Sequence, residues 1–198
     1  MDRTIFVSER GACAVRRSTD GGSTWTAFQV TRDGCALARV VVSPLSHDGR
    51  MLYALGADYG LWRSVDRDAT WTMMSPDHHA DLAFDPVSAG QFYTVDGNNV
   101  SWYWEDFNLW RDPVPLAGAN VIGLASYQGP YVGTSDGRVY ESLDRGQTWY
   151  EISTFSGDPI RDIVATDDVI YVLTASGLIG GYREGAPVPA TPTPLPIP

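Results

Sequence analysis

The sequence predicts an all-β protein made of repeated units, and three observations lead to this prediction. One short motif occurs three times, over residues 18–25, 64–71 and 142–149. No stretch of the chain shows a sustained apolar period of 3.6 residues, so little helix is expected. Short apolar runs are separated by turn residues such as Asp85-Pro86 and Asp96-Gly97-Asn98-Asn99, as they are between β-strands.

The spacing of the motif gives the size of the repeated unit. The tryptophan that ends it recurs as Trp25, Trp71, Trp110 and Trp149, at intervals of 46, 39 and 39 residues. Trp110 marks a unit in which the rest of the motif has been replaced. Between Trp71 and Trp110 we expect four strands, near residues 80–85, 91–95, 100–104 and 109–114. A repeat of roughly 40–45 residues with four strands has the size of one β-propeller blade.

An aromatic residue recurs in what we expect to be the second strand of each unit, as Phe6, Tyr53, Tyr93, Tyr131 and Tyr171. By this register the first and last units have three strands each, which predicts 18 strands in about five four-stranded blades, the first and last incomplete. Three arrangements fit: a five-bladed ring with two thin blades, part of a larger propeller, or a ring closed by a second copy. Open blade edges would leave strands available for self-association.

The motif Ser-x-Asp-x-Gly-x-Thr-Trp resembles the Asp-box, also called the BNR repeat. Three motifs in phase over residues 1–183 make the chain similar to the Asp-box β-propellers of sialidases, sortilin-type receptors, xyloglucan-cleaving glycosidases and photosystem II assembly factors. The second motif departs from the pattern, because Asp68 stands where glycine is usual. The resemblance implies that these motifs are structural and lie away from the ligand-binding face.

Turn chemistry explains why the motif needs these residue types. The aspartate can accept hydrogen bonds from N–H groups of its own turn, and the glycine allows a positive φ. The threonine can donate back across the turn, and the tryptophan then enters the fourth strand, where it can pack between blades. We therefore interpret as structural the residues Ser18, Asp20, Gly22, Thr24, Trp25, Ser64, Asp66, Thr70, Trp71, Ser142, Asp144, Gly146, Thr148 and Trp149.

Length and charge limit the functions that the chain can have. At 198 residues and 43% hydrophobic, the chain is long enough for one domain with a core, which we place at residues 1–185. The net charge of −10 argues against nucleic acid and anionic membrane surfaces as partners. No apolar run of 18 residues occurs, so membrane insertion is not expected. We expect no cofactor and no metal.

Residues 186–198 are rich in proline and threonine, which predicts an extended linker or tail. This tail resembles the stalks of bacterial extracellular domains and favours an extracellular or cell-envelope location. No signal peptide is visible, which leaves a cytoplasmic location as the alternative. Cys13 and Cys35 are expected in connections on the same face, as a disulfide in an oxidising compartment or as two independent thiols.

Propellers usually bind ligands at the face formed by the second-to-third strand loops and the connections between blades. Here that face is polar and could hold a sugar or a peptide; its candidate residues are Arg32, Asp33, Asp58, Tyr59, Asp77, Asp96, Asn98, Asp136, Asp158 and Arg161. A glycosidase needs two carboxylates about 5–10 Å apart, and the aspartates of this face, with Asp81, offer candidates that the sequence does not pair.

Two further patterns have a functional and a structural interpretation. His78-His79-x-Asp81 could suggest a metal site, but adjacent strand residues point to opposite faces, so we interpret it as a loop. Trp102 falls in register with Val15, Trp62 and Tyr140 and is expected in the core, whereas Trp104 is the aromatic residue to test for exposure.

The leading functional hypothesis is a non-catalytic propeller that serves as a binding module of an extracellular or envelope protein, with a carbohydrate or a protein as ligand. It rests on intact scaffold motifs beside no recognisable catalytic set. The alternative is a glycoside hydrolase, sialidase-like or glucanase-like, or a fragment of one. A third hypothesis is an assembly factor that binds a protein tail.

Overall fold

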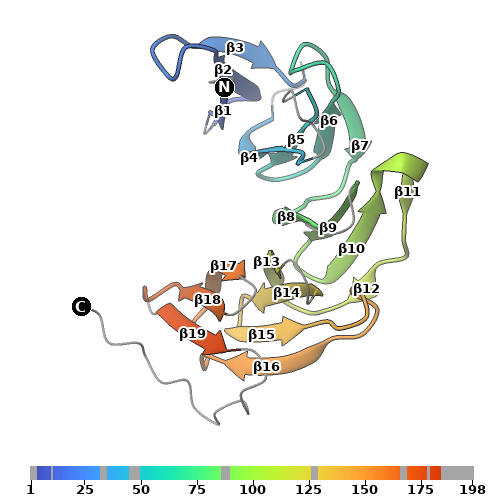
Figure 1. Cartoon of the computed structure of the whole chain (residues 1–198), viewed down its shortest axis with the longest axis vertical. Coiled ribbons are helices and arrows are strands. Elements are labelled where there is room, and N and C mark those ends of the chain that lie inside the picture. The colour runs from blue at the N-terminus through green and yellow to red at the C-terminus, as the bar shows by residue number, and fades with distance from the viewer. Residues whose placement is uncertain are drawn as a thin grey trace. The chain divides into compact units, whose positions relative to one another are not determined.

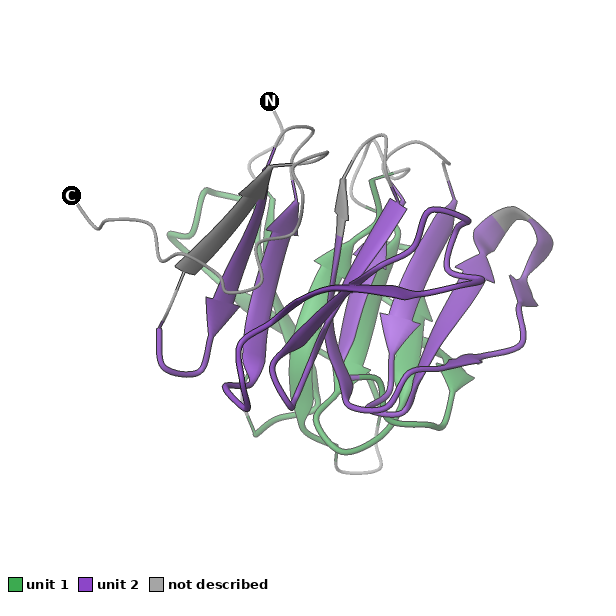
Figure 2. Cartoon of the chain, turned by 90° about the horizontal axis from the view of Figure 1, so that it is seen from below, with its two compact units in different colours: residues 1–79 green, residues 80–198 purple. Residues whose placement is uncertain are grey.

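The computed structural model of the chain describes residues 4–9, 11–31, 35–44, 50–85, 90–125, 129–165, 169–177 and 179–183. The regular structure in these ranges is β-strand except for one 3₁₀ helix, η1 (Glu105–Phe107) (Figure 1). The chain divides into two compact units, residues 1–79 and residues 80–198 (Figure 2). No helix in the described ranges is long and apolar enough to cross a membrane. The tail at 186–198 lies outside the described residues, and a single domain over 1–185 remains a prediction.

The first unit contains two antiparallel sheets in which each strand pairs with the next one along the chain. The first sheet has the three strands β1 (Ile5–Ser8), β2 (Ala14–Ser18) and β3 (Thr26–Gln29). The second has the four strands β4 (Leu37–Val42), β5 (Leu52–Gly56), β6 (Leu61–Ser64) and β7 (Thr72–Ser75).

The second unit contains three antiparallel sheets of the same up-and-down order. The first is built from β8 (Asp81–Phe84), β9 (Gln91–Val95), β10 (Asn99–Trp104), β11 (Leu109–Trp110) and β12 (Val114–Pro115). The next contains β13 (Ala119–Ala125), β14 (Gly129–Thr134), β15 (Arg138–Glu141) and β16 (Tyr150–Thr154). The last contains β17 (Ile160–Ala165), β18 (Val169–Thr174) and β19 (Ile179–Arg183).

The all-β class is therefore as predicted, and the described strands group into sheets much as the aromatic register indicates. The difference lies in the first sheet of the second unit, where the outer strand is split into two short pieces. Both β11 and β12 pair with β10, through Tyr103↔Trp110 and Val100↔Val114. Pro113 lies between the two pieces, and a proline has no N–H to donate to the ladder. With this split, the described residues form 19 strands.

The second strand of each complete sheet lies in the core. Tyr53, Tyr93 and Tyr131 are at most 1% exposed, as their shared register suggests. Tyr171 differs, because β18 alternates and its buried apolar residues, Ile170 and Val172, are the ones that pack with Tyr131 in one hydrophobic cluster. Tyr171 therefore points to the opposite face of the last sheet and is 42% exposed.

The contact between the sheets β13–β16 and β17–β19 depends on a missing side chain at Gly133. A Cβ at this position would lie 2.4 Å from Ile160 Cγ2 and 2.9 Å from Val121 Cγ2. We expect Gly133→Ala to lower the free energy of unfolding by about 1–3 kcal/mol, the usual cost of overpacking a core. Urea denaturation would measure this loss. The loss should shrink in an Ile160→Ala background, where room for the methyl group exists; an equal loss there would contradict the steric explanation.

The three copies of the sequence motif form turns with one common hydrogen-bond pattern, and we call residues 18–25, 64–71 and 142–149 the repeat turns. In the third, Asp144 Oδ1 accepts from Thr148 N at 2.8 Å and Asp144 Oδ2 accepts from Thr148 Oγ1 at 2.6 Å. Ser142 Oγ donates to Asp144 Oδ1 and accepts from Gly146 N at 2.7 Å. The same bonds are made by Ser18, Asp20 and Thr24 and by Ser64, Asp66 and Thr70.

The tryptophans that end the repeat turns are not equally buried. Trp71 and Trp149 pack against the hydrophobic clusters of their own units. Trp25 is 38% exposed, and its Nε1 donates to Gly22 O at 3.0 Å. In the first repeat turn the indole therefore supports the turn itself more than the core.

The repeat-turn carboxylates should make the fold sensitive to acid. Hydrogen bonds from the Thr148 side chain and backbone lower the pKa of Asp144 to about 2. A lowered folded-state pKa stabilises the fold above the ordinary value near 4, and this contribution is lost as the pH falls toward 2. We expect Asp144→Asn to melt at a lower temperature than the native chain at pH 7, with the gap closing by pH 2. The matched control is Asp162→Asn, because Asp162 is an exposed residue of the same unit. This variant should have the melting temperature of the native chain at both pH values.

The structure joins Cys13 and Cys35 in a disulfide, with 4.8 Å between their Cα atoms. The bond links the segment before β2 to the segment before β4. Leu37 N donates to Ala12 O at 3.1 Å beside it, so the disulfide reinforces a contact between the first two sheets.

Candidate functional site

The loops that the sequence assigns to a ligand-binding face are tied into local structure. Arg32 and Asp33 lie outside the described residues. Asp58 and Tyr59 lie in the β5–β6 turn, which meets the segment after β7 where Gly60 N donates to Asp77 O at 2.9 Å. The Tyr59 ring packs edge-on against Trp62, with 5.9 Å between ring centroids. In the first unit these three candidates, Asp58, Tyr59 and Asp77, thus lie along one pair of adjoining loops.

In the second unit two candidate aspartates stabilise hairpins. In the β9–β10 turn, Asp96 Oδ1 accepts from Asn98 N at 2.8 Å and from Asn99 N at 2.7 Å. In the β14–β15 turn, Asp136 accepts from Thr134 Oγ1 and forms a 3.1 Å ion pair with Arg138 Nε. Both carboxylates are thus engaged within their own hairpins.

Asp158 links two loops of the last sheet, next to the exposed Arg161 on β17. Its carboxylate accepts from Thr174 Oγ1 at 2.6 Å and from Ser176 N at 3.1 Å. Hydrogen bonds from the side chains of Ser176 and Thr174 lower its pKa. A carboxyl group with a lowered pKa is poorly suited to act as the general acid of a glycosidase, which needs a raised one.

The His78-His79-x-Asp81 segment contains a structural carboxylate. Asp81 is 6% exposed; its Oδ1 accepts from Leu82 N at 2.8 Å and its Oδ2 accepts from Ile122 N at 3.1 Å. The second bond connects β8 to β13, and it therefore holds two sheets of the second unit together. Among the described residues, no group of three or more histidine, cysteine, aspartate or glutamate side chains is arranged to hold a metal ion.

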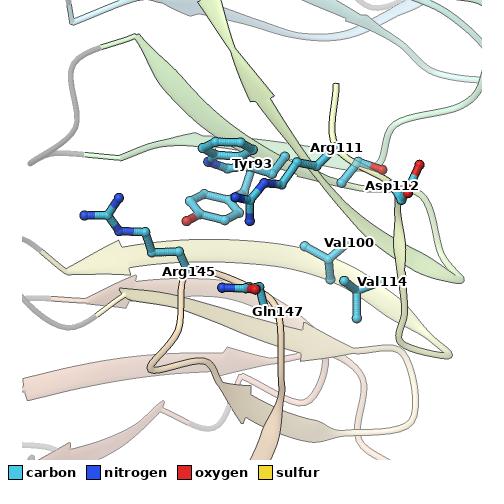
Figure 3. Close-up of a pocket in the computed structure, with 10 residues that line it drawn as sticks. Tyr93, Val100, Arg111, Asp112, Val114, Arg145 and Gln147 are labelled. Atoms are coloured by element: carbon cyan, nitrogen blue, oxygen red, sulfur yellow. The ribbon is translucent and has the colours of Figure 1, made fainter. Parts of the chain in front are cut away.

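A pocket of about 270 Å³ lies within the second unit, between the split outer strand of its first sheet and the third repeat turn (Figure 3). Its lining comes from β9 and β10, from the break between β11 and β12, and from the repeat turn: Tyr93, Val100, Ser101, Trp102, Arg111, Asp112, Val114, Arg145, Gly146 and Gln147. The split outer strand therefore supplies one wall of this pocket.

Local structure positions each wall. Arg111 N donates to Trp102 O at 2.9 Å and keeps the chain on β10 until Pro113 interrupts the ladder. The repeat turn approaches Tyr93 closely at Gly146, which has φ +79°. A Cβ on Gly146 would lie 3.1 Å from Tyr93 Cε1. Gly146 therefore allows the positive φ of its own turn and also the close approach of this turn to Tyr93 in the pocket.

The pocket brings cationic and aromatic groups together. The Arg111 guanidinium lies 4.5 Å from the centre of the Trp102 ring, a cation–π contact. Tyr93 is 1% exposed, and burial raises the pKa of its hydroxyl. Asp85 and Asp144 raise this pKa further, whereas the guanidiniums of Arg145 and Arg111 lower it. The hydroxyl therefore stays protonated at neutral pH and is available as a donor.

Most of this pocket was not predicted from the sequence. Trp102 was expected in the core, where it is 8% exposed, and Gly146 in a turn. Arg111, Arg145 and Gln147 were not singled out, because they lie in positions interpreted as structural. The signal that could have indicated them is the sequence Arg111-Asp112-Pro113 directly after Trp110, which breaks an outer strand.

Comparison with protein-family models gave no match. A xyloglucanase from a Paenibacillus species is 29% identical over 185 residues, which cover 85% of this chain and 16% of that protein. The chain therefore spans about one sixth of this relative.

Several solved structures share the fold. A GH74 enzyme from Niastella koreensis has a TM-score of 0.72 at 18% identity, covering 98% of this chain and 36% of that one. YCF48 bound to D1 peptide has a TM-score of 0.66 at 13% identity, covering 91% and 60%. A chain of a nidogen/laminin complex has a TM-score of 0.69 at 12% identity, covering 92% and 72%. With its successive antiparallel sheets, the chain has a β-propeller fold.

Proposed function

We propose that the chain is a ligand-binding β-propeller module and that the pocket between β10–β12 and the third repeat turn is its binding site. The observation that carries this proposal is the pocket lining, where two arginines that form no ion pair with a described residue flank a buried tyrosine hydroxyl. Concave sites with an apolar wall and a few polar groups are typical of ligand binding.

The similar structures support a binding role without identifying the ligand. One of them is a propeller bound to a peptide, and another is part of a protein complex. A protein or peptide is therefore one ligand class for this chain. A carbohydrate is the other, because a xyloglucanase is 29% identical to this chain over 185 residues.

An extracellular or envelope location belongs to the same proposal. The disulfide between Cys13 and Cys35 supports it, because disulfides form and persist in oxidising compartments. Self-association through the edges of the two three-stranded sheets is also proposed. Sedimentation over a range of protein concentrations would measure it, and a monomer at every concentration would exclude it.

The second candidate is that the chain is part of a glycoside hydrolase, and the 29% identity to a xyloglucanase favours it. This candidate needs a pair of carboxylates across a cleft. The described pocket contributes one, Asp112. Asp96, Asp136 and Asp158 are engaged in turns, so the binding role has the stronger structural support.

One experiment separates the two functions. The chain is incubated with xyloglucan and with mixed-linkage glucan, and released reducing ends are measured; in parallel, glycan and peptide arrays are screened for binding. We expect binding without hydrolysis, and we expect Val114→Trp, which fills the pocket from a half-buried position, to abolish that binding. Hydrolysis that disappears in Asp58→Asn or Asp77→Asn would overturn the proposal in favour of the enzyme.

A further inference from the structure

We infer that the pocket binds the carboxylate of a hexuronic acid residue, held by Arg111 and Arg145. This inference rests on the proposed function and specifies the ligand class of the same site. It is argued from charge, from the donors available, and from the size and apolar wall of the pocket.

The charge of the pocket is opposite to that of the chain. The whole protein has a net charge of −10, whereas the pocket is lined by two arginines and one aspartate, Asp112. Asp85 and Asp144 also act on the Tyr93 hydroxyl. Asp144, however, already accepts hydrogen bonds from Ser142, Gln147 and Thr148 within its own turn. An arginine pair in an otherwise acidic protein selects an anionic group.

The donors of the pocket suit a carboxylate. The guanidiniums of Arg111 and Arg145 both act on the Tyr93 hydroxyl, which is protonated at neutral pH and belongs to a side chain that is 1% exposed. In Figure 3 the Tyr93 hydroxyl lies between these two side chains. Trp102 Nε1 is buried without a partner in the described part of the chain. Hydrogen bonds from charged donors to a carboxylate are roughly twice as strong as neutral ones.

The rest of the lining suits a hydroxylated ring. Val100 and Val114 lie side by side on one wall (Figure 3), where they can contact ring C–H groups. Asp112 and Gln147 are exposed and can bond sugar hydroxyls. A volume of about 270 Å³ lies just below the range of pockets for drug-sized ligands, which leaves room for one ring. A neutral sugar would lack its usual stacking surface, because Arg111 covers a face of Trp102 at 4.5 Å.

The test is a titration of the full ¹⁵N-labelled chain followed by NMR, using the indole N–H of Trp102 assigned with Trp102→Phe. The probes are the methyl glycosides of glucuronate and galacturonate, their neutral counterparts, acetate and sulfate. We expect a uronate to shift the Trp102 signal and to bind at least about tenfold more tightly than its neutral counterpart, the value of one charged hydrogen bond. Arg111→Gln and Arg145→Gln should each weaken binding by about tenfold.

The matched control is Arg138→Gln, which removes one exposed charge from the same unit outside the pocket. Uronate affinity should change less than about twofold in this variant, since surface charges act weakly at physiological salt. Melting curves of all three variants check folding, and because these arginines are exposed no loss of fold is expected.

The outcomes separate this inference from the proposed function. Equal affinity for uronate and neutral sugar, affinity for acetate or sulfate as high as for uronate, or sensitivity to Arg138 instead of Arg111 would each overturn the uronate assignment. A peptide or neutral glycan from the arrays that shifts the Trp102 signal would overturn it too, while the binding function stands. Hydrolysis of glucans with no ligand shifting that signal would overturn both.

Discussion

Replacing Cys13 and Cys35 together with serine should lower the free energy of unfolding by about 3 kcal/mol. The two cysteines are joined in a disulfide and are 22 residues apart in the sequence. Breaking a cross-link of that span restores chain entropy to the unfolded state, and the expected gain in entropy corresponds to about 3 kcal/mol at room temperature. Urea denaturation of the full chain, followed by tryptophan fluorescence, would measure the loss.

The experiment needs a control for the change of side chain as well as for the loss of the disulfide. Cys13 is 7% exposed and packs in a cluster with Val15, Val30 and Leu37, so serine adds a buried hydroxyl. A second variant with alanine at both positions separates this cost from that of the cross-link. Reducing agent should destabilise the native chain to the level of the alanine variant and leave that variant unchanged.

Backbone contacts at the same place provide the competing explanation. Val30 N donates to Cys13 O at 2.9 Å, and Leu37 N donates to Ala12 O at 3.1 Å. If these contacts alone keep the loops together, with or without the disulfide, the alanine variant will be as stable as the native chain. That result would mean that the disulfide is a by-product of proximity in an oxidising compartment and contributes nothing to stability.

The parts of the fold that could be predicted are those specified by local, repeated chemistry. A serine, an aspartate and a threonine at fixed spacing determine a turn, because the bonds of Asp144 to Thr148 and Ser142 stay within eight residues. The buried tyrosines of the second strands follow from the same period. Tyr171 departs from it because only one face of β18 packs with the Tyr131 cluster, and the period does not state which face is covered.

The pocket could not be predicted, because it depends on residues that are distant in sequence. Arg111 and Arg145 come from two different sheets, and each alone is an ordinary surface arginine. Their common action on Tyr93 appears only when the third repeat turn packs against β9 and β10. The aspartates of the predicted ligand face show the converse. Asp96 and Asp158 were selected by type and position, and the structure shows the Asp96 carboxylate bonded within its own hairpin and the Asp158 carboxylate bonded to Thr174 in another loop of the same sheet.

The other large expected effect on the free energy of unfolding concerns Asp68 in the second repeat turn. Asp68 replaces glycine at a position with φ +68° and is fully buried. Its Oδ1 forms a 2.8 Å ion pair with Arg17, whose guanidinium also lies 4.4 Å from the Phe28 ring centre. Its Oδ2 is buried with no hydrogen-bond partner in the described part of the chain. Burial raises the pKa of Asp68 to about 6, against the opposing effect of Arg17.

The sign of the pH effect follows from that shift. A carboxyl group whose folded-state pKa exceeds its ordinary value near 4 holds its proton more tightly in the folded protein. Its contribution to stability is greatest below pH 4 and declines as the pH rises to about 6. Relative to Asp68→Asn, which has no such titration, the native chain should lose about 2 kcal/mol of unfolding free energy between pH 4 and pH 7.

Asparagine is the matched substitution, because it keeps the shape of the side chain and tolerates a positive φ. Urea denaturation of both chains at pH 4, 5, 6 and 7 gives the difference directly, and the background from other groups cancels in it. Asp58→Asn, in the same unit, should show a constant difference from the native chain over this range. The contrary result is that the native chain gains stability over Asp68→Asn as the pH rises. The ion pair with Arg17 would then outweigh the cost of burying the charge, and it would stabilise the contact between β2 and the second repeat turn at neutral pH.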